Sequence, residues 1–204
     1  SGTMTNTKDT PQNNFCTINP LDNYYQASTF ANGNNKITMG GGYPFNTGTM
    51  GMTRGKWYWE LLLRDKGTND YQLFGITGDP CTSSTNWLGT NLYGWGLYND
   101  ETNLKNNNTS VGGYTGVGFT TGDYLGVAID LDNLKLYFHK NGTWVNSGVP
   151  TSGATGTGAA SITAPASTTF GCYLPALGQL SIMATEWETN FGNGYFGTTS
   201  SGTT

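Results

Sequence analysis

The segment 122–144, GDYLGVAIDLDNLKLYFHKNGTW, constrains the fold of this chain more than any other stretch. Apolar residues recur at every second position in each of its two halves. They are Val127, Ile129, Leu131, Leu134, Leu136 and Phe138. This period of two places the apolar side chains on one face of a strand and the polar ones on the other. Asp132-Asn133 and Asn141-Gly142 supply the turns. The segment therefore predicts an antiparallel hairpin with one buried face.

The composition favours many short strands over helices. Glycine accounts for 31 of the 204 residues, and only 11% of the residues are charged. The core volume that the modest aliphatic content lacks comes from 6 Trp, 12 Tyr and 9 Phe. Turn signals recur every ~8–12 residues, which is the spacing typical of an antiparallel sandwich. We therefore expect an all-β chain in which two antiparallel sheets bury one core.

Charge and hydropathy exclude several classes of partner. A net charge of −4 argues against a nucleic-acid binder, which needs a basic stripe to neutralise phosphates. No apolar run approaches the ~20 residues that cross a bilayer, so we expect no membrane insertion. The polar first residues lack the apolar centre of a secretory signal. Cys16, Cys81 and Cys172 are odd in number and lack CxxC spacing, so we expect three unpaired thiols.

Further strands are expected along the chain. They are 34–39, 47–52, 56–64, 71–77, 92–98, 170–174, 179–183 and 190–196. The polar segment 100–118 is expected to be a surface loop with at most one short strand, and 148–168 an uncharged loop. We expect one domain over 15–197, between a flexible lead-in at 1–14 and a flexible tail at 198–204.

Ordered motifs across residues 55–196 resemble those of a SPRY domain. They are GKWYWE at 55–60, FGI at 74–76, the hairpin at 122–142, YLPA at 173–176, and NFG at 190–192 with Phe196. The resemblance implies a sandwich of concanavalin-like jelly-roll architecture that recognises peptides or proteins through loops at one edge. Leu134 stands where the family usually has glycine, so we expect Asn133 to take the left-handed turn position.

A narrower resemblance concerns three phrases of the sequence. DTPQNNFCTINPLDN, YGWGLYND and FHKNGTWVNSG are similar to SPRY-type segments in phage and environmental viral structural or tail-associated proteins. This similarity implies a location in the virion (phage particle), within a tail fibre or adhesin that recognises a host surface protein or a surface glycan. Passive decoration of a capsid or fibre, a homo-oligomer, and a part of a larger virion protein remain open as alternatives.

The residues that could carry catalysis or bind a metal are sparse. His139 is the single histidine, and we expect it to be solvated on the outward face of the hairpin. Asp130 and Asp132 lie two apart and point to the same face, where the SPRY pattern explains them as surface and turn residues. Asn99-Asp100-Glu101 is a weak calcium candidate. We therefore expect that the chain is not an enzyme and that it binds neither a metal nor a cofactor. A carbohydrate-active enzyme is the alternative, and it would need two facing carboxylates about 5–9.5 Å apart.

Aromatic and amide side chains on loops carry the functional prediction. Flat apolar faces suit stacking and amides suit directional hydrogen bonds, so such loops on a rigid sandwich favour a binding surface. The residues predicted to bind the partner are Trp87, Tyr98, Asn99, Asp100, Asn106, Asn107, Asn108 and Tyr114. Tyr93 and Trp95 also lie in or next to these loops, and the alternative for these two residues is burial in the core. Trp57, Tyr58 and Trp59 are consecutive, so at least one must face away from the core.

Overall fold

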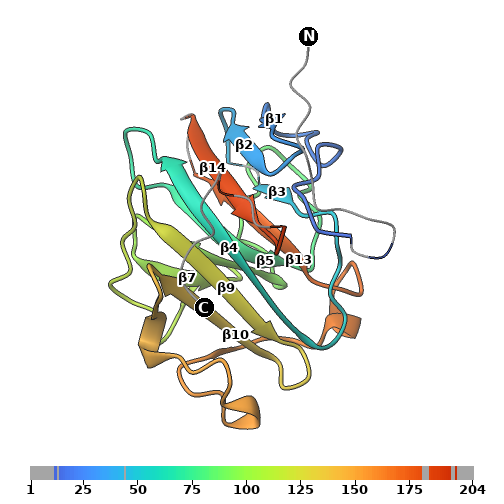
Figure 1. The fold of residues 1–204 in the computed structure, drawn as a ribbon, viewed down its shortest axis with the longest axis vertical. Helices are drawn as coiled ribbons and strands as arrows, with labels where there is room; N and C mark the ends of the chain where they lie inside the picture. The colour runs from blue at the N-terminus through green and yellow to red at the C-terminus, as the bar shows by residue number, and fades with distance from the viewer. Residues whose placement is uncertain (1–11, 13, 44, 181–183, 194–195, 197–204) are drawn as a thin grey trace.

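Two antiparallel β-sheets pack face to face in the computed structural model of the chain, which describes residues 12, 14–43, 45–180, 184–193 and 196 (Figure 1). This confirms the prediction of an all-β sandwich. Helical structure within the described ranges is limited to three short 3₁₀ turns, and no helix there is long and apolar enough to cross a membrane. The expected lead-in, apart from residues 12 and 14, and the expected tail lie outside the described residues.

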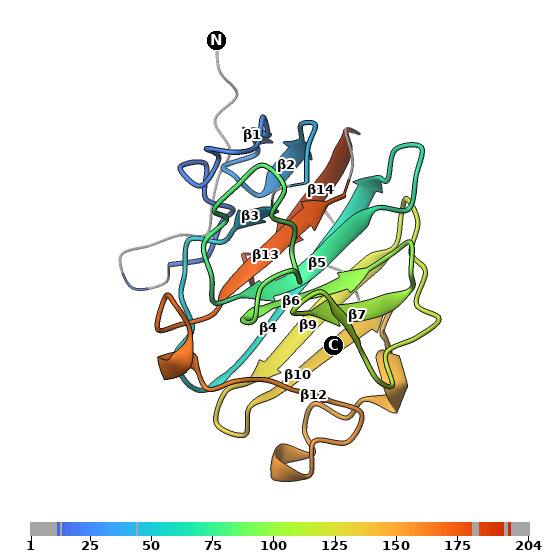
Figure 2. The ribbon, with the colours of Figure 1, turned by 180° about the vertical axis from the view of Figure 1, so that it is seen from behind.

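The larger sheet faces the viewer in Figure 1, and the smaller sheet does so in Figure 2. The strands of the larger sheet are β1 (Thr29–Ala31), β2 (Lys36–Met39), β4 (Lys56–Asp65), β9 (Tyr124–Asp130), β10 (Lys135–Lys140), β11 (Thr143–Trp144), β12 (Ala160–Ser161) and β14 (Thr185–Asn190). Those of the smaller sheet are β3 (Phe45–Thr47), β5 (Gln72–Thr77), β6 (Gly94–Tyr98), β7 (Asn103–Asn106), β8 (Thr109–Val111) and β13 (Leu174–Gln179). The 3₁₀ turns are η1 (Val145–Ser147), η2 (Gly153–Thr155) and η3 (Pro165–Ser167).

The order of the strands is β1-β2-β14-β4-β9-β10-β11 in the larger sheet, with β12 beside β10, and β3-β13-β5-β6-β7-β8 in the smaller one. Alternate residues of each strand point between the sheets and form the core. Phe74 lies among aromatic rings, with centroids 5.4 Å from Phe119, 5.5 Å from Phe138 and 6.3 Å from Trp187. The aromatic residues therefore supply the core volume, as the composition predicts.

The predicted hairpin is present as β9 and β10, but its turn differs from the expectation. Leu134, not Asn133, has the left-handed conformation, with φ at +57°. The Asp130 carboxylate accepts the N–H groups of Asp132 and Asn133, both at 3.1 Å, and so holds these two residues in the turn. The left-handed position therefore falls on the next residue. Leu134 packs against the core there, and its carbonyl accepts the N–H of Ile162 at 3.1 Å.

Other predicted strands are shifted or incomplete. The segment 100–118 contains two strands, β7 and β8, because Asn107 and Asn108 both take positive φ and close a tight hairpin between them. In place of the predicted strands 170–174 and 179–183, β13 runs through Pro175, whose carbonyl accepts the N–H of Gly48 at 2.8 Å. Residues 181–183 lie outside the described ranges.

The three cysteines are unpaired, as expected. Cys16 is buried, and Cys81 and Cys172 are half-buried. Burial raises the pKa of each thiol, which keeps the thiols protonated near neutral pH and lowers their reactivity.

Candidate functional site

Two of the residues predicted to bind a partner, Tyr98 and Asn99, are buried at the end of β6. They are 5% and 3% exposed. The Asn99 amide donates to Gln72 Oε1 at 2.8 Å and to Phe119 O at 2.7 Å, and its oxygen accepts the Phe119 N–H at 2.6 Å. Their burial corrects the expectation that these side chains face a partner, because Asn99 instead holds the end of the 100–118 segment against the core.

Tyr114 is a third correction, since it is 1% exposed. Its ring packs edge-on against Phe138, with centroids 6.0 Å apart. Its hydroxyl donates to Gly158 O at 2.7 Å and lies 3.0 Å from Leu136 O. Burial raises the pKa of this phenol far above its usual range. Tyr114 thus joins two loops to β10 and is not available to a ligand.

The remaining predicted residues are spread over the loop 78–93, β7 and the turns on either side of β7. Trp87 is half-buried in the loop 78–93, where its ring lies 6.2 Å from that of Tyr98 on the outer side of the smaller sheet. Asp100 precedes β7, whereas the turn at 107–108 follows it, so these exposed residues lie at opposite ends of that strand. Asn106 is half-buried, and its amide donates to Gly94 O at 2.8 Å. Partner binding by these residues stays a prediction.

The acidic residues of the hairpin have structural partners. Asp130 is 3% exposed and forms an ion pair with Lys56. Burial alone would raise the pKa of Asp130, but hydrogen bonds from Lys56 and Asn133 lower it below its usual range. In the weak calcium candidate, the Glu101 carboxylate pairs with Lys105. Across the described part of the chain, no group of three or more His, Cys, Asp or Glu side chains is arranged to hold a metal ion.

His139 is 1% exposed, so the prediction of a solvated histidine is wrong. The rings of Tyr58 and Trp144 cover it, with centroids 5.8 and 4.9 Å away. The Gly142 N–H lies 3.3 Å from Nδ1, while Nε2 lies 2.8 Å from Tyr58 Oη, which donates to Glu60 Oε1 at 2.6 Å. Burial lowers the pKa of His139, against an opposing effect of Glu60. This network suits a neutral imidazole that donates from Nε2.

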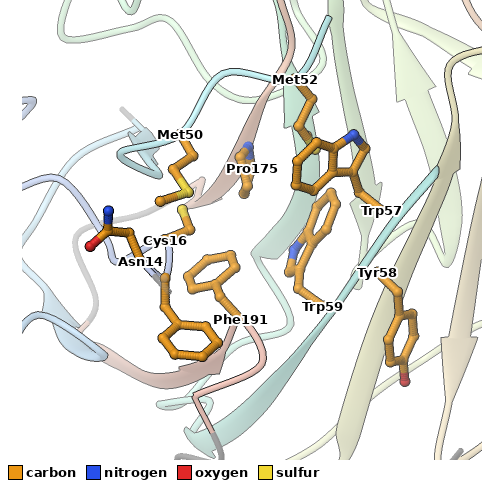
Figure 3. Close-up of a pocket in the computed structure, with 10 residues that line it drawn as sticks. Asn14, Cys16, Met50, Met52, Trp57, Tyr58, Trp59, Pro175 and Phe191 are labelled. Atoms are coloured by element: carbon orange, nitrogen blue, oxygen red, sulfur yellow. The ribbon is translucent and has the colours of Figure 1, made fainter. Parts of the chain in front are cut away.

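An apolar hollow of about 100 Å³ opens beside the start of β4 (Figure 3). Its lining comes from the chain before β1, the connection from β3 to β4, β4 itself, β13 and the chain after β14. The lining residues are Asn14, Phe15, Cys16, Met50, Met52, Trp57, Tyr58, Trp59, Pro175 and Phe191. We call this site the Trp57 hollow. This volume exceeds the ~10–15 Å³ that a cavity needs to hold one water, so the hollow has room for several waters or for an apolar side chain.

The alternation of β4 gives its consecutive aromatic residues different roles. Trp59 is 3% exposed and forms part of the inner wall, with its ring 6.4 Å from Phe191. Trp57 lies on the same side of the strand but is 47% exposed. Its indole N–H donates to Arg54 O at 2.8 Å, which fixes the ring at the rim. Tyr58 points away from the hollow (Figure 3) and covers His139.

Trp57 is exposed because β14 pairs with β4 only from Asn190 opposite Glu60 onward. Among the described residues, no strand therefore neighbours the first residues of β4 on that side. Three consecutive aromatic residues in one strand were the available sequence signal, but the alternation of β4 does not show which of them remains uncovered. The described side chains that line the hollow carry no carboxylate, imidazole or ammonium group, so this part of the site suits apolar binding and not acid–base chemistry.

Comparisons with known proteins agree with this architecture. A sequence model of the SPRY domain matches residues 56–164. The crystal structure of the SPRY domain of human HERC1 matches with a TM-score of 0.62 and 17% sequence identity, covering 86% of this chain and 98% of that chain. At this identity the similarity concerns the fold. A search of curated proteins finds no match.

Proposed function

This chain belongs to the SPRY domain family of protein-binding modules, and we propose that it binds a partner protein by taking an apolar side chain of that partner into the Trp57 hollow. The main support for this proposal is Trp57, which is 47% exposed yet fixed by its hydrogen bond to Arg54 O. A rigid aromatic residue at the rim of an apolar hollow is the usual form of a binding hot spot. The role that follows is non-catalytic.

Arg54, whose carbonyl accepts the indole N–H of Trp57, is a charged residue next to the rim of the hollow in the chain. Arg54 is exposed and forms no ion pair with any other described residue. A carboxylate next to the inserted apolar side chain would meet this guanidinium. We therefore propose a short partner segment in which a large apolar residue adjoins Asp or Glu.

A protein partner fits this hollow better than a glycan does. Sugar recognition needs several directional hydrogen bonds beside a stacking ring, and Asn14 is the one amide side chain among the described lining residues. The other lining groups are aromatic, aliphatic or sulfur-containing, apart from the Tyr58 hydroxyl, which points away.

A selection from a displayed peptide library tests this function. We expect selected peptides to share an apolar residue next to an acidic one, and to bind the Trp57→Ser variant at least tenfold more weakly, because truncation of a hot-spot aromatic typically costs that much. Leu92→Ser is the matched control, since Leu92 is 52% exposed and lies outside the lining. Peptides that bind wild type and Trp57→Ser equally well would refute the proposed site.

We further propose that this module belongs to a virion, where it serves a tail fibre or adhesin and its partner is a host surface protein or a neighbouring virion protein. The support is the similarity of the phrases DTPQNNFCTINPLDN, YGWGLYND and FHKNGTWVNSG to phage-type segments. Mass spectrometry of purified particles that encode the chain tests this setting. Absence of its peptides from intact particles would reject it.

A further inference from the structure

A polar groove of about 410 Å³ lies between three segments that are distant in sequence. They are the loop 78–93 after β5, the turn 107–108 between β7 and β8, and the chain after η3. This volume falls within the ~300–1,000 Å³ of small-molecule binding sites. The polar residues that line the groove are Asp79, Thr82, Thr90, Asn91, Asn107 and Thr169. We call this site the Asp79 groove.

Main-chain hydrogen bonds join the three segments. The Gly78 N–H donates to Tyr93 O at 2.8 Å, which closes the loop on itself. The Phe170 N–H donates to Gly78 O at 3.0 Å, and the Asn107 N–H donates to Asn91 O at 3.1 Å. The walls of the groove are therefore fixed before a ligand arrives, which lowers the entropy that binding costs.

The Asp79 carboxylate needs more hydrogen-bond donors than the described residues give it. Asp79 is 9% exposed, and none of the ion pairs found in the described part of the chain involves it. Its oxygens accept the Tyr93 N–H at 3.1 Å and the Thr169 hydroxyl. An ionised carboxylate has about four acceptor sites, so about two remain for a ligand. Because a buried charge is costly unless it is paired or hydrogen-bonded, donors from a ligand would stabilise this carboxylate.

The other walls of the groove supply neutral polar groups and one apolar ledge. Asn107 and Thr82 are exposed, and in the part of the chain that the structure describes neither side chain takes part in a hydrogen bond. The amide and the hydroxyl can each donate and accept. Leu92, which also lines the groove, is 52% exposed. The groove thus places a carboxylate, an amide and a hydroxyl beside an apolar surface.

We propose that the Asp79 groove binds a neutral glycan, two neighbouring hydroxyl groups of which donate to the Asp79 carboxylate. A sugar hydroxyl both donates and accepts, so it can also pair with Asn107 and Thr82. The C–H face of the sugar ring would pack on Leu92. An ammonium group would satisfy the carboxylate, but it only donates and would leave the donors of Asn107 and Thr82 without acceptors. The negative charge of Asp79 disfavours acidic sugars such as sialic acid.

A glycan array of the full chain, followed by titration calorimetry of the glycans that bind, tests the proposal. The probes are oligosaccharides that end in galactose, glucose or mannose, together with their sialylated forms. We expect binding to neutral probes only. Asp79→Asn keeps the shape of the side chain but removes its charge, so it should weaken binding roughly tenfold or more, as expected for hydrogen bonds to a charged group.

Two adjacent turn residues give a matched pair of variants. Asn107 and Asn108 both have positive φ, at 49° and 56°, which glycine adopts without strain. Only Asn107 is among the described residues that line the groove. Asn107→Gly should therefore weaken binding by about three- to tenfold, the usual worth of a hydrogen bond, whereas Asn108→Gly should bind like the wild type.

Several outcomes would reject the proposal. A wild type that binds none of the neutral probes excludes it, and so does equal weakening by Asn107→Gly and Asn108→Gly. A preference for sialylated probes, or for a lysine-rich peptide over every sugar, would show that the carboxylate recognises something other than a neutral glycan. Circular dichroism checks that each variant is folded. If Asp79→Asn does not fold, the pair at positions 107 and 108 decides.

This inference is independent of the proposed function. The described residues that line the Asp79 groove and the Trp57 hollow do not overlap, so a glycan and a selected peptide should bind at the same time without competing. Trp57→Ser should leave glycan binding unchanged. A chain that binds peptides but no glycan would refute this inference alone, and a chain that binds a glycan but no peptide would refute the proposed function alone.

Discussion

The segments 19–28 and 100–118 resemble each other in composition but face opposite ways. Both are rich in Asn and contain Tyr, and neither has an obvious apolar face. The second segment buries Tyr114 at 1% exposure, and the first leaves Tyr24 at 88%. Composition therefore does not decide which tyrosine reaches solvent. Which tyrosine reaches solvent is decided by the hydrogen bonds that tie each segment to a neighbouring strand.

The anchoring side chains explain the difference. Asn99 holds the Phe119 backbone, which closes the 100–118 segment over the end of the core and brings Tyr114 against Phe138. In the other segment Asp22 accepts two hydrogen bonds from Thr47 and occupies the side that faces β3. The apolar residues next to Asp22 are left on the outer side.

The largest expected effect comes from the same substitution made in both segments. We expect Tyr114→Ala to lower the free energy of unfolding by about 3–5 kcal/mol, because it opens a cavity in the core. Tyr24→Ala should change it by no more than about 0.5 kcal/mol, as expected for a surface residue. Urea unfolding measures both. Equal losses of stability would show that the contrast between the segments is not real.

The sequence was sufficient for the fold because the decisive signals were local. The alternation in 122–144 predicted β9 and β10, and the dense apolar run at 56–64 predicted β4. These strands pair with each other at the centre of the larger sheet. Where tertiary contacts select the turn, the prediction failed, as at Leu134, because the Asp130 carboxylate determines which residue becomes left-handed.

The candidate site was harder to predict because exposure depends on neighbours distant in sequence. Trp57 is uncovered because β14 stops short of it, and His139 is covered because Tyr58 and Trp144 lie over it. Neither fact is visible in the alternation of a single strand. The predicted asparagines at 106–108 mark a turn because amide side chains suit positive φ as well as ligand binding.

Asp22→Ala tests the anchor of the segment 19–28, with a smaller effect. Loss of the hydrogen bonds from Thr47 to the carboxylate should lower the free energy of unfolding by about 1–3 kcal/mol. Leu21 and Tyr24 remain exposed, but the backbone of the segment should loosen, so chymotrypsin should cut at Tyr24 faster than in the wild type. Asp100→Ala is the control, since Asp100 is exposed in the other segment. Unchanged cleavage would mean that Asp22 does not hold the segment 19–28 in place.

The smallest expected effect concerns His139. The alternation of β10 places this residue on the outward face of the hairpin, but the structure buries it. Burial lowers the pKa of His139 in the folded chain below its ordinary value of 6.5. Below that pH the unfolded chain binds a proton that the folded chain excludes, so the free energy of unfolding falls as the pH drops from about 6.5. Above about 6.5 the imidazole is neutral in both states and contributes no slope.

His139→Gln should abolish this change of the free energy of unfolding with pH. It should leave any change below about pH 4, where carboxylates such as Asp123 and Asp130 have their lowered pKa values. Urea unfolding from about pH 5 to 7.5 measures the difference. The charge of Glu60 opposes the lowering, so Glu60→Gln should steepen the slope that His139 causes. A wild type without any slope in this range would place the imidazole in solvent. The aromatic cover of Tyr58 and Trp144 would then not exclude water, and the hairpin would have the open outer face that its alternation predicts.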